Sequence, residues 1–307
     1  MAASPTAPAG RALPQLVSNG VSLCMTPERL GWLVPSDPGQ PMEVLREQYA
    51  RQGYLWLRGL LDRDAVLAFR AHYFSEMAAA GLIAPGSDPA EGVFAGGGAD
   101  QSRMAAIHLE IVRSPYYAAL CLSRPMVAFY EAFFGGPVML HRRKLLRHFA
   151  PGNPHSTGAH YDLVYLRGGT DQLCTSWIPL GDTPVEMGGL CYLEGADAWG
   201  RTLEADYNAR SGDLSPAERV QAFNRHMTRA WLTHDLRALA DQTDRRWLVA
   251  DYAAGDMVVH SAYMVHASTV NTDAAGRIRL STDIRYQRVA DPVDQRWQNE
   301  WSPDDGL

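Results

Sequence analysis

The sequence His160-Tyr161-Asp162, followed much later by Val265-His266-Ala267-Ser268, decides how the rest of this chain is interpreted. In an extended strand, residues i and i+2 project to the same side, so His160 and Asp162 can reach one metal ion if they lie on a strand. With His266 they complete the two-histidine, one-carboxylate set that binds ferrous iron and leaves further coordination positions open. Such positions admit a bidentate cosubstrate and O₂, so the pattern predicts a non-haem iron(II) oxygenase that uses 2-oxoglutarate.

An arginine follows the second histidine at a spacing that suits a cosubstrate anchor. A guanidinium group can hold a carboxylate through two parallel hydrogen bonds. We therefore expect Arg277 to bind the far carboxylate of 2-oxoglutarate while the keto-acid end chelates the iron. Arg279 is the alternative, because residues two apart lie on the same face of a strand.

Two further histidines compete with this assignment. His260 precedes His266 by an even number of residues, so both can point inward from one strand. Only His266 has the correct spacing to Arg277, so we expect His260 to pack near the metal without binding it. His108 forms another H-x-E pair with Glu110, but that segment is predicted to be helical. Residues i and i+2 do not share a face of a helix, so this pair cannot chelate a metal ion.

These motifs resemble those of the phytanoyl-CoA dioxygenase (PhyH-like) family of Fe(II)/2-oxoglutarate enzymes, over most of the chain from about Glu43 onward. Besides the first histidine-aspartate pair, the similar segments are Leu45–Leu61, Thr175–Leu180, Gly188–Gly195 and Gly255–Arg277. Each segment is a weak signal alone. All of them in order, at family-like spacing, make a specific one.

The resemblance implies roles for individual residues. The implied roles are iron binding and catalysis for His160, Asp162 and His266, and 2-oxoglutarate binding for Arg277, Ser268 and Trp177. Arg279-Leu280-Ser281 also resembles the R-x-S cosubstrate clamp of related oxygenases, which keeps Arg279 as the competitor. Asp162 stands where halogenating relatives carry Ala or Gly. Its carboxylate occupies the position that chloride needs, so halogenation is disfavoured.

The resemblance and the short strands separated by turns from Val138 onward predict a mainly β fold with flanking helices around a double-stranded β-helix, a jelly-roll or cupin-like core. Residues 1–40 are expected to form a loosely ordered lead-in, and residues 41–307 a single oxygenase domain. The polar, helix-forming stretch 202–246 interrupts the strands. We expect it to be a lid or substrate-binding insertion, with a dimer contact or solvated cover as the alternative.

Composition limits the partners and the compartment. The net charge of −6 over 307 residues argues against nucleic acid and anionic membranes as partners. There is no apolar run of membrane-spanning length and no signal peptide pattern, so a cytoplasmic location is expected. The four scattered cysteines are interpreted as reduced thiols rather than disulfides or a zinc site. A small-molecule substrate and a monomer or homodimer fit these limits.

The predicted reaction is oxidation, most simply hydroxylation, of an unactivated C–H bond of a small metabolite in natural-product biosynthesis, with release of succinate and CO₂. Desaturation, cyclisation or epimerisation with the same cofactors is the nearest alternative. A non-oxidative jelly-roll metal-binding protein or cupin-like isomerase is the alternative from another class. The residues near the ligand pair that are candidates for substrate contact are Arg142, Arg143, Tyr161 and Tyr165.

Overall fold

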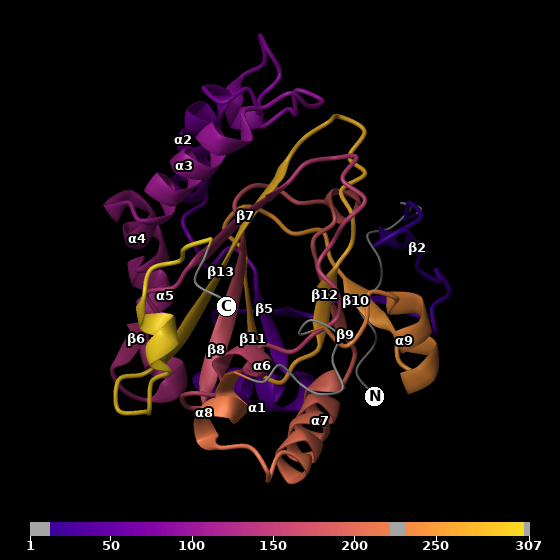
Figure 1. Cartoon of the computed structure of the whole chain (residues 1–307), viewed down its shortest axis with the longest axis vertical. Helices are drawn as coiled ribbons and strands as arrows, with labels where there is room; N and C mark the ends of the chain where they lie inside the picture. Colours follow the sequence, from indigo (N-terminus) through magenta and orange to yellow (C-terminus); the bar gives the residue numbers. More distant parts are fainter. Residues whose placement is uncertain (1–12, 222–230, 304–307) are drawn as a thin grey trace.

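The computed structural model describes residues 13–221 and 231–303 of the chain. Two β-sheets form its centre, and helices lie outside them (Figure 1). The larger sheet has the order β4 (Pro35–Ser36), β5 (Tyr54–Leu57), β11 (Met257–Ser261), β8 (Leu173–Pro179), β13 (Arg279–Arg288) and β6 (Val138–Leu140), with β7 (Leu145–Phe149) also pairing with β13. The smaller sheet has the order β12 (His266–Ser268), β9 (Leu190–Leu193), β10 (Trp247–Val249) and β3 (Leu30–Trp32). The predicted mainly β fold with a jelly-roll core is confirmed.

Helices cover the outer face of the larger sheet. They are α1 (Met42–Gln52), α2 (Arg63–Ala78), α3 (Gln101–Val112), α4 (Pro115–Cys121) and α5 (Arg124–Phe134). Aromatic side chains of these helices, among them Phe69 and Tyr130, pack in one buried cluster with Ile284 of β13. The remaining helices are α6 (Leu163–Leu166), α7 (Ala196–Arg210), α8 (Pro216–Gln221) and α9 (Leu236–Thr243). None of the helices in the described part of the chain is both long and apolar enough to cross a membrane.

Strand β13 sets which side chains face the interior between the sheets. Its side chains alternate between the two faces, as the pleat of a strand requires. Leu280 and Ile284 belong to the cluster beneath the helices. The alternate residues, from Arg279 to Arg285, line a cavity on the opposite face. A single strand therefore supplies both apolar packing on one side and buried charges on the other.

The first residues that the structure describes are more ordered than the sequence predicts. Residues 13–40 include β1 (Val17–Ser18) and β2 (Val21–Ser22), which form a small sheet of their own. Strand β3 pairs with β10, strand β4 pairs with β5, and Leu30 and Leu33 are buried. The expectation of a loosely ordered lead-in therefore does not hold for residues 13–40, and residues 1–12 lie outside the described part. Strands of two or three residues are too short to give a periodic signal.

Two half-buried histidines, His108 of α3 and His148 of β7, should make the stability of the metal-free protein depend on pH. The Tyr73 hydroxyl lies between His108 and His148, and burial lowers the pKa of both imidazoles to about 4 from 6.5. Between these values the unfolded chain binds protons that the folded protein does not. The free energy of unfolding should therefore fall as pH drops from 6.5 toward 4, by about 2 kcal/mol or more.

Urea denaturation of the metal-free protein at about pH 7 and pH 5 measures this effect. His108→Asn should reduce the pH dependence by the share of that imidazole, whereas His155→Asn, at an exposed position, should leave it unchanged. Equal stability of the unsubstituted protein at both values would contradict the expectation.

Candidate metal centre and active site

His160 lies beside His266, the first residue of β12 at the edge of the smaller sheet. Their backbones form an isolated antiparallel bridge, with N–H···O distances of 3.0 and 2.9 Å in the two directions. The chain then turns, and Asp162 occupies the N-cap position of α6 with helical backbone angles. The expected continuous strand through the first pair is therefore replaced by a bridge and a turn. The three side chains still converge as predicted, because ligand atoms of the three residues lie within 4.8 Å of one another.

Both histidines present the correct nitrogen to a metal ion. The Nδ1 atoms of His160 and His266 lie 2.9 and 2.8 Å from the backbone carbonyls of Gly158 and Met264. A carbonyl only accepts hydrogen bonds, so each Nδ1 carries the proton and each Nε2 keeps a free lone pair. Burial lowers the pKa of both imidazoles, which keeps them neutral and able to bind a cation. The two Nε2 atoms lie 3.7 and 3.8 Å from Asp162 Oδ1.

The carboxylate of Asp162 is held by one of its oxygens, which leaves the other for the metal. Oδ2 accepts hydrogen bonds from Thr175 and, at 3.0 Å, from Nη2 of Arg285. Burial alone favours the neutral carboxyl group, but Arg285 and the neighbouring histidines lower its pKa well below the ordinary value. The donor set therefore consists of two neutral imidazoles and one carboxylate on one side of a cavity. These residues fit a ferrous ion with open coordination positions.

His260 lies directly behind this centre. It is fully buried, and its Nε2 atom is 3.5 Å from Asp162 Oδ2, the oxygen turned away from the two ligand histidines. Its Nδ1 atom pairs with the Tyr192 hydroxyl at 2.9 Å. His260 is thus placed to support the carboxylate rather than to complete the group of ligand atoms.

A small polar cavity adjoins the metal centre, and Arg279 lies in its wall. Ser268 and Trp177, both predicted to help bind the cosubstrate, also line this cavity. Arg279 is 2% exposed, and its Nε and Nη1 atoms have no hydrogen-bond partner. Burial lowers the pKa of its guanidinium to about 10. A buried cation with unsatisfied donors is costly, so this position favours the binding of an anion.

Arg277, the predicted anchor, does not reach the cavity. It precedes β13, its side chain is 40% exposed, and it forms an ion pair at 2.7 Å with Asp273. Asp273 also accepts the backbone N–H of Arg277, so the carboxylate closes a local turn. The expectation that Arg277 faces the metal therefore conflicts with its position, because the strand begins only two residues later. The structure brings the alternative, Arg279, to the cavity instead.

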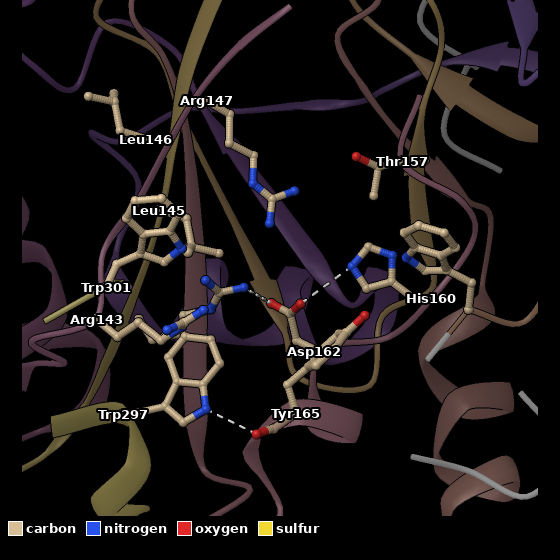
Figure 2. A pocket seen from close by; sticks show the side chains of 12 residues that line it. Arg143, Leu145, Leu146, Arg147, Thr157, His160, Asp162, Tyr165, Trp297 and Trp301 are labelled. Atoms are coloured by element: carbon tan, nitrogen blue, oxygen red, sulfur yellow. Dashed lines mark hydrogen bonds and ion pairs between the residues drawn. The ribbon is translucent and has the colours of Figure 1, made fainter. Parts of the chain in front are cut away.

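A second, larger cavity of about 250 Å³ also borders His160 and Asp162 (Figure 2). Its lining is aromatic and basic: Arg143, Arg147, Arg285, Tyr165, Trp231, Trp297 and Trp301, together with aliphatic side chains of β7. Arg143 and Tyr165 were candidates for substrate contact and do line it. The other two candidates do not line this cavity: the side chain of Arg142 is 67% exposed and pairs with Glu300, and the Tyr161 hydroxyl donates to Glu204.

Sequence reasoning missed Arg285, Arg147 and the three tryptophans. Arg285 shares the inner face of β13 with Arg279, because it lies six positions further along the strand, an even offset. The two-residue periodicity of a strand could therefore have identified Arg285 as a residue of the cavity. Trp231 lies far from Trp297 and Trp301 in the chain, and no local pattern links the two segments.

A buried ion pair fixes the segment that carries the metal ligands. Glu204 of α7 accepts hydrogen bonds from the Tyr161 hydroxyl at 2.9 Å and from Arg167 at 2.6 and 2.8 Å. Both charged side chains are at most 7% exposed. Glu204→Ala leaves the Arg167 guanidinium buried without this partner, so we expect a loss of about 3–5 kcal/mol and a melting temperature lower by roughly 10 °C.

Thermal unfolding followed by circular dichroism measures this loss. Asp206→Ala is the control on the same helix, because the pair of Asp206 with Arg210 is exposed and should contribute under about 1 kcal/mol. Equal melting temperatures for the two variants would show that the buried pair does not stabilise this segment.

Comparison with known proteins agrees with this geometry. The sequence pattern of the phytanoyl-CoA dioxygenase (PhyH) family matches residues 49–279. The chain belongs to this family. The prediction of a PhyH-like, non-haem iron and 2-oxoglutarate-dependent oxygenase is confirmed, and the metal centre described above is the one this chemistry requires.

Individual relatives of this PhyH-family enzyme are moderately similar. A 1-deoxypentalenic acid 11-beta-hydroxylase of Streptomyces arenae is 28% identical over 256 residues, which cover 80% of this chain and 81% of the relative. Among solved structures, the carbocyclase SnoK from nogalamycin biosynthesis has a TM-score of 0.54 at 20% identity, covering 85% of this chain and 89% of SnoK. The epimerase SnoN, in complex with Fe3+, alpha ketoglutarate and nogalamycin RO, has a TM-score of 0.53 at 19% identity, covering 82% and 85%. These structural likenesses show the shared fold.

Proposed function

We propose that this enzyme uses iron(II), 2-oxoglutarate and O₂ to hydroxylate an unactivated C–H bond of a small metabolite in natural-product biosynthesis, with release of succinate and CO₂. The observation that carries the proposal is the position of Arg279, a buried cation with unsatisfied donors in the cavity beside the metal ligands. A non-oxidative metal site has no use for such a group. A dicarboxylate cosubstrate that chelates the metal has a second carboxylate for it.

In this proposal, separate groups of residues bind the iron, the cosubstrate and the substrate. His160, Asp162 and His266 hold the iron, which when loaded with 2-oxoglutarate and O₂ supplies the oxidising power. Arg279 binds the far carboxylate of 2-oxoglutarate, with Ser268 and Trp177 shaping the same cavity. Arg285 and Thr175 fix the orientation of the Asp162 carboxylate. The larger cavity places the substrate beside the metal and excludes water from it.

Hydroxylation is favoured over the other outcomes by the curated relatives. Two of them, from Streptomyces arenae and Streptomyces exfoliatus, are named as 11-beta-hydroxylases of 1-deoxypentalenic acid. Epimerisation and cyclisation are the activities named for more distant structures of the same fold. Desaturation, cyclisation and epimerisation stay as the alternatives, because the same cofactors support all of them.

The stretch 202–246 serves in this proposal as a cover over the substrate cavity. Trp231 lines that cavity, and Thr233 forms a backbone bridge with Ala159, next to the first metal ligand. The helical part begins earlier than expected, at Ala196, and residues 222–230 lie outside the described part.

Anaerobic titration of the iron-loaded protein with 2-oxoglutarate tests the cofactor assignment. The visible charge-transfer band of a chelated keto acid should appear. Turnover under O₂ with 1-deoxypentalenic acid as the first substrate tried then tests the reaction. A product heavier by one oxygen atom supports hydroxylation, and loss of two hydrogen atoms indicates desaturation or ring closure. An isomer of unchanged mass indicates epimerisation. Absence of the charge-transfer band from folded, iron-loaded protein would contradict the proposal.

A further inference from the structure

A groove on the outside of the molecule adjoins the cavities at the metal centre. It has a volume of about 380 Å³ and lies between α3 and β7 (Figure 1). Each element contributes four residues to its walls: Gln101, Met104, Ala105 and His108 from the helix, and Leu146, Arg147, His148 and Phe149 from the strand. The proposed function so far makes no use of this space.

Two strand residues belong both to the groove and to the small polar cavity that contains Arg279, the cosubstrate cavity. Arg147 and Phe149 line both spaces, so the groove and the cavity adjoin at these side chains. The guanidinium carbon of Arg279 lies 4.0 Å from the centre of the Phe149 ring, and the two residues pair across β7 and β13. One aromatic ring therefore separates the groove from the cation that is assigned to the far carboxylate of 2-oxoglutarate.

The cosubstrate cavity has little contact with solvent. Of the described residues that line it, only Arg147 is exposed, with 43% of its side chain accessible. Phe149, Thr157 and Asp283 are half-buried, and the others are buried. The larger cavity that is assigned to the substrate has the same pattern, because Arg147 is again the one exposed residue of its described lining. Arg147 therefore marks the side on which both cavities come closest to solvent.

The side chain of Arg147 is held less firmly than that of Arg285. Its Nε atom is 3.8 Å from the carboxylate of Asp283, a distance longer than a hydrogen bond, whereas Arg285 donates to Asp162 at 3.0 Å. Exposed side chains of this kind change rotamer within nanoseconds, so Arg147 can move aside for an entering molecule. Its positive charge also attracts a dianion to the inner end of the groove.

We propose that the groove between α3 and β7 is the entrance through which 2-oxoglutarate reaches the metal centre, past Arg147 and Phe149. The inference rests on the proposed function, because it takes Arg279 as the residue that binds the far carboxylate. The alternative path leads through the substrate cavity and is closed while a substrate fills that cavity. A separate entrance lets 2-oxoglutarate bind, and succinate leave, while the substrate cavity is occupied.

Closing the groove with a chemical plug tests this inference. Ala105 is exposed and lines the groove but neither cavity, so Ala105→Cys places a thiol on the wall away from the metal ligands. The thiol is labelled with methyl methanethiosulfonate or with the much bulkier dansylamidoethyl methanethiosulfonate. Anaerobic stopped-flow mixing of the iron(II)-loaded protein with 2-oxoglutarate then gives the rate at which the charge-transfer band appears.

The bulky label should slow the appearance of the band at least about tenfold, because an occluded path lowers the association rate constant. The methyl label should leave the rate close to that of the unlabelled protein. The equilibrium affinity for 2-oxoglutarate should be the same in all three samples, because a plug outside the cavity changes neither the empty nor the occupied site. Removal of the bulky label with a reductant should restore the rate.

Ala106→Cys is the matched control, because Ala106 is also exposed on α3 but does not line the groove. Its bulky label should leave the rate unchanged. Unsubstituted protein treated with the same reagent controls for Cys24, which is half-buried, whereas the other three cysteines are buried. If Ala105→Cys does not fold, Gln101→Cys replaces it, because Gln101 is another exposed residue of the groove wall.

Three results would overturn the inference. One is an unchanged rate in the fully labelled Ala105→Cys variant, which would assign entry to another path. Another is equal slowing by the bulky label in the Ala105→Cys and Ala106→Cys variants. The third is a weaker equilibrium affinity with the bulky label, which would show that the label disturbs the cosubstrate site itself. Failure of the unlabelled protein to form the band contradicts the proposed function instead, so the two failures are distinguishable.

Discussion

Asp162→Ala is expected to abolish iron binding and to lower turnover on the order of a thousandfold or more. The substitution removes Oδ1, the only charged ligand atom, and leaves two neutral imidazoles. In a chloride-free buffer nothing replaces the lost carboxylate, so the two neutral imidazoles should bind the ferrous ion far more weakly than the complete set of ligands. Iron content after anaerobic reconstitution and dialysis, together with succinate formation, measures the two effects.

The same substitution also affects folding, and the two effects must be separated. Arg285 loses the partner of its Nη2 atom while it remains buried, which costs about 3–5 kcal/mol in the metal-free protein. Asp162→Ala combined with Arg285→Met removes both partners and should recover most of that stability without recovering iron. Asp283→Asn is the control, because this carboxylate lies in the same cavity but outside the ligand group. Full iron binding by the stable double variant would show that the ligand assignment is wrong.

The metal centre was predictable from the sequence because chemistry restricts it. A ferrous site needs particular residue types, and His160 and Asp162 are adjacent enough in the chain for their spacing to carry information. Even so, the local geometry differed, since Asp162 lies at the N-cap position of α6, where its side chain makes no capping hydrogen bond, instead of continuing a strand. A metal site requires only that its three ligand side chains converge, and more than one backbone conformation allows this.

The cosubstrate anchor was harder to predict because a strand boundary decides it. Arg277 and Arg279 are two residues apart and would lie on the same face of a continuous strand. The sequence alone therefore does not show which of them binds the cosubstrate. Arg277 lies before the strand and forms an ion pair with the nearby carboxylate of Asp273. Arg279 is the first residue of β13, and its side chain lines the cavity beside the metal ligands. Boundaries are the least reliable part of any sequence-based assignment.

The substrate cavity could not be predicted from local patterns. Trp297 follows the last strand in a short 3-10 helix (Gln295–Gln298), and its indole N–H donates to the carbonyl of Tyr165. Trp231 comes from the stretch between α8 and α9. Only the tertiary fold brings these segments to one wall, and neither has the periodicity of a strand or an amphipathic helix.

Arg279→Met is expected to weaken 2-oxoglutarate binding about a hundredfold while leaving iron binding intact. A charge-assisted, two-pronged hydrogen bond to a carboxylate accounts for a loss of this size. The same substitution should not destabilise the metal-free protein, because it removes a buried charge whose Nε and Nη1 atoms have no partner. Titration of the charge-transfer band gives the affinity, and thermal unfolding without cofactors gives the stability.

Arg277→Met is the matched control, since it removes the same group two residues earlier. Its side chain is 40% exposed and pairs with Asp273, so the affinity for 2-oxoglutarate should change by less than about threefold. The pair of variants separates the two candidate anchors directly. Weaker binding in Arg277→Met with normal binding in Arg279→Met would assign the cosubstrate to the residue outside the cavity, and the position of β13 would then not describe the loaded enzyme. The opposite result identifies Arg279, on the inner face of β13, as the residue that binds the far carboxylate of 2-oxoglutarate.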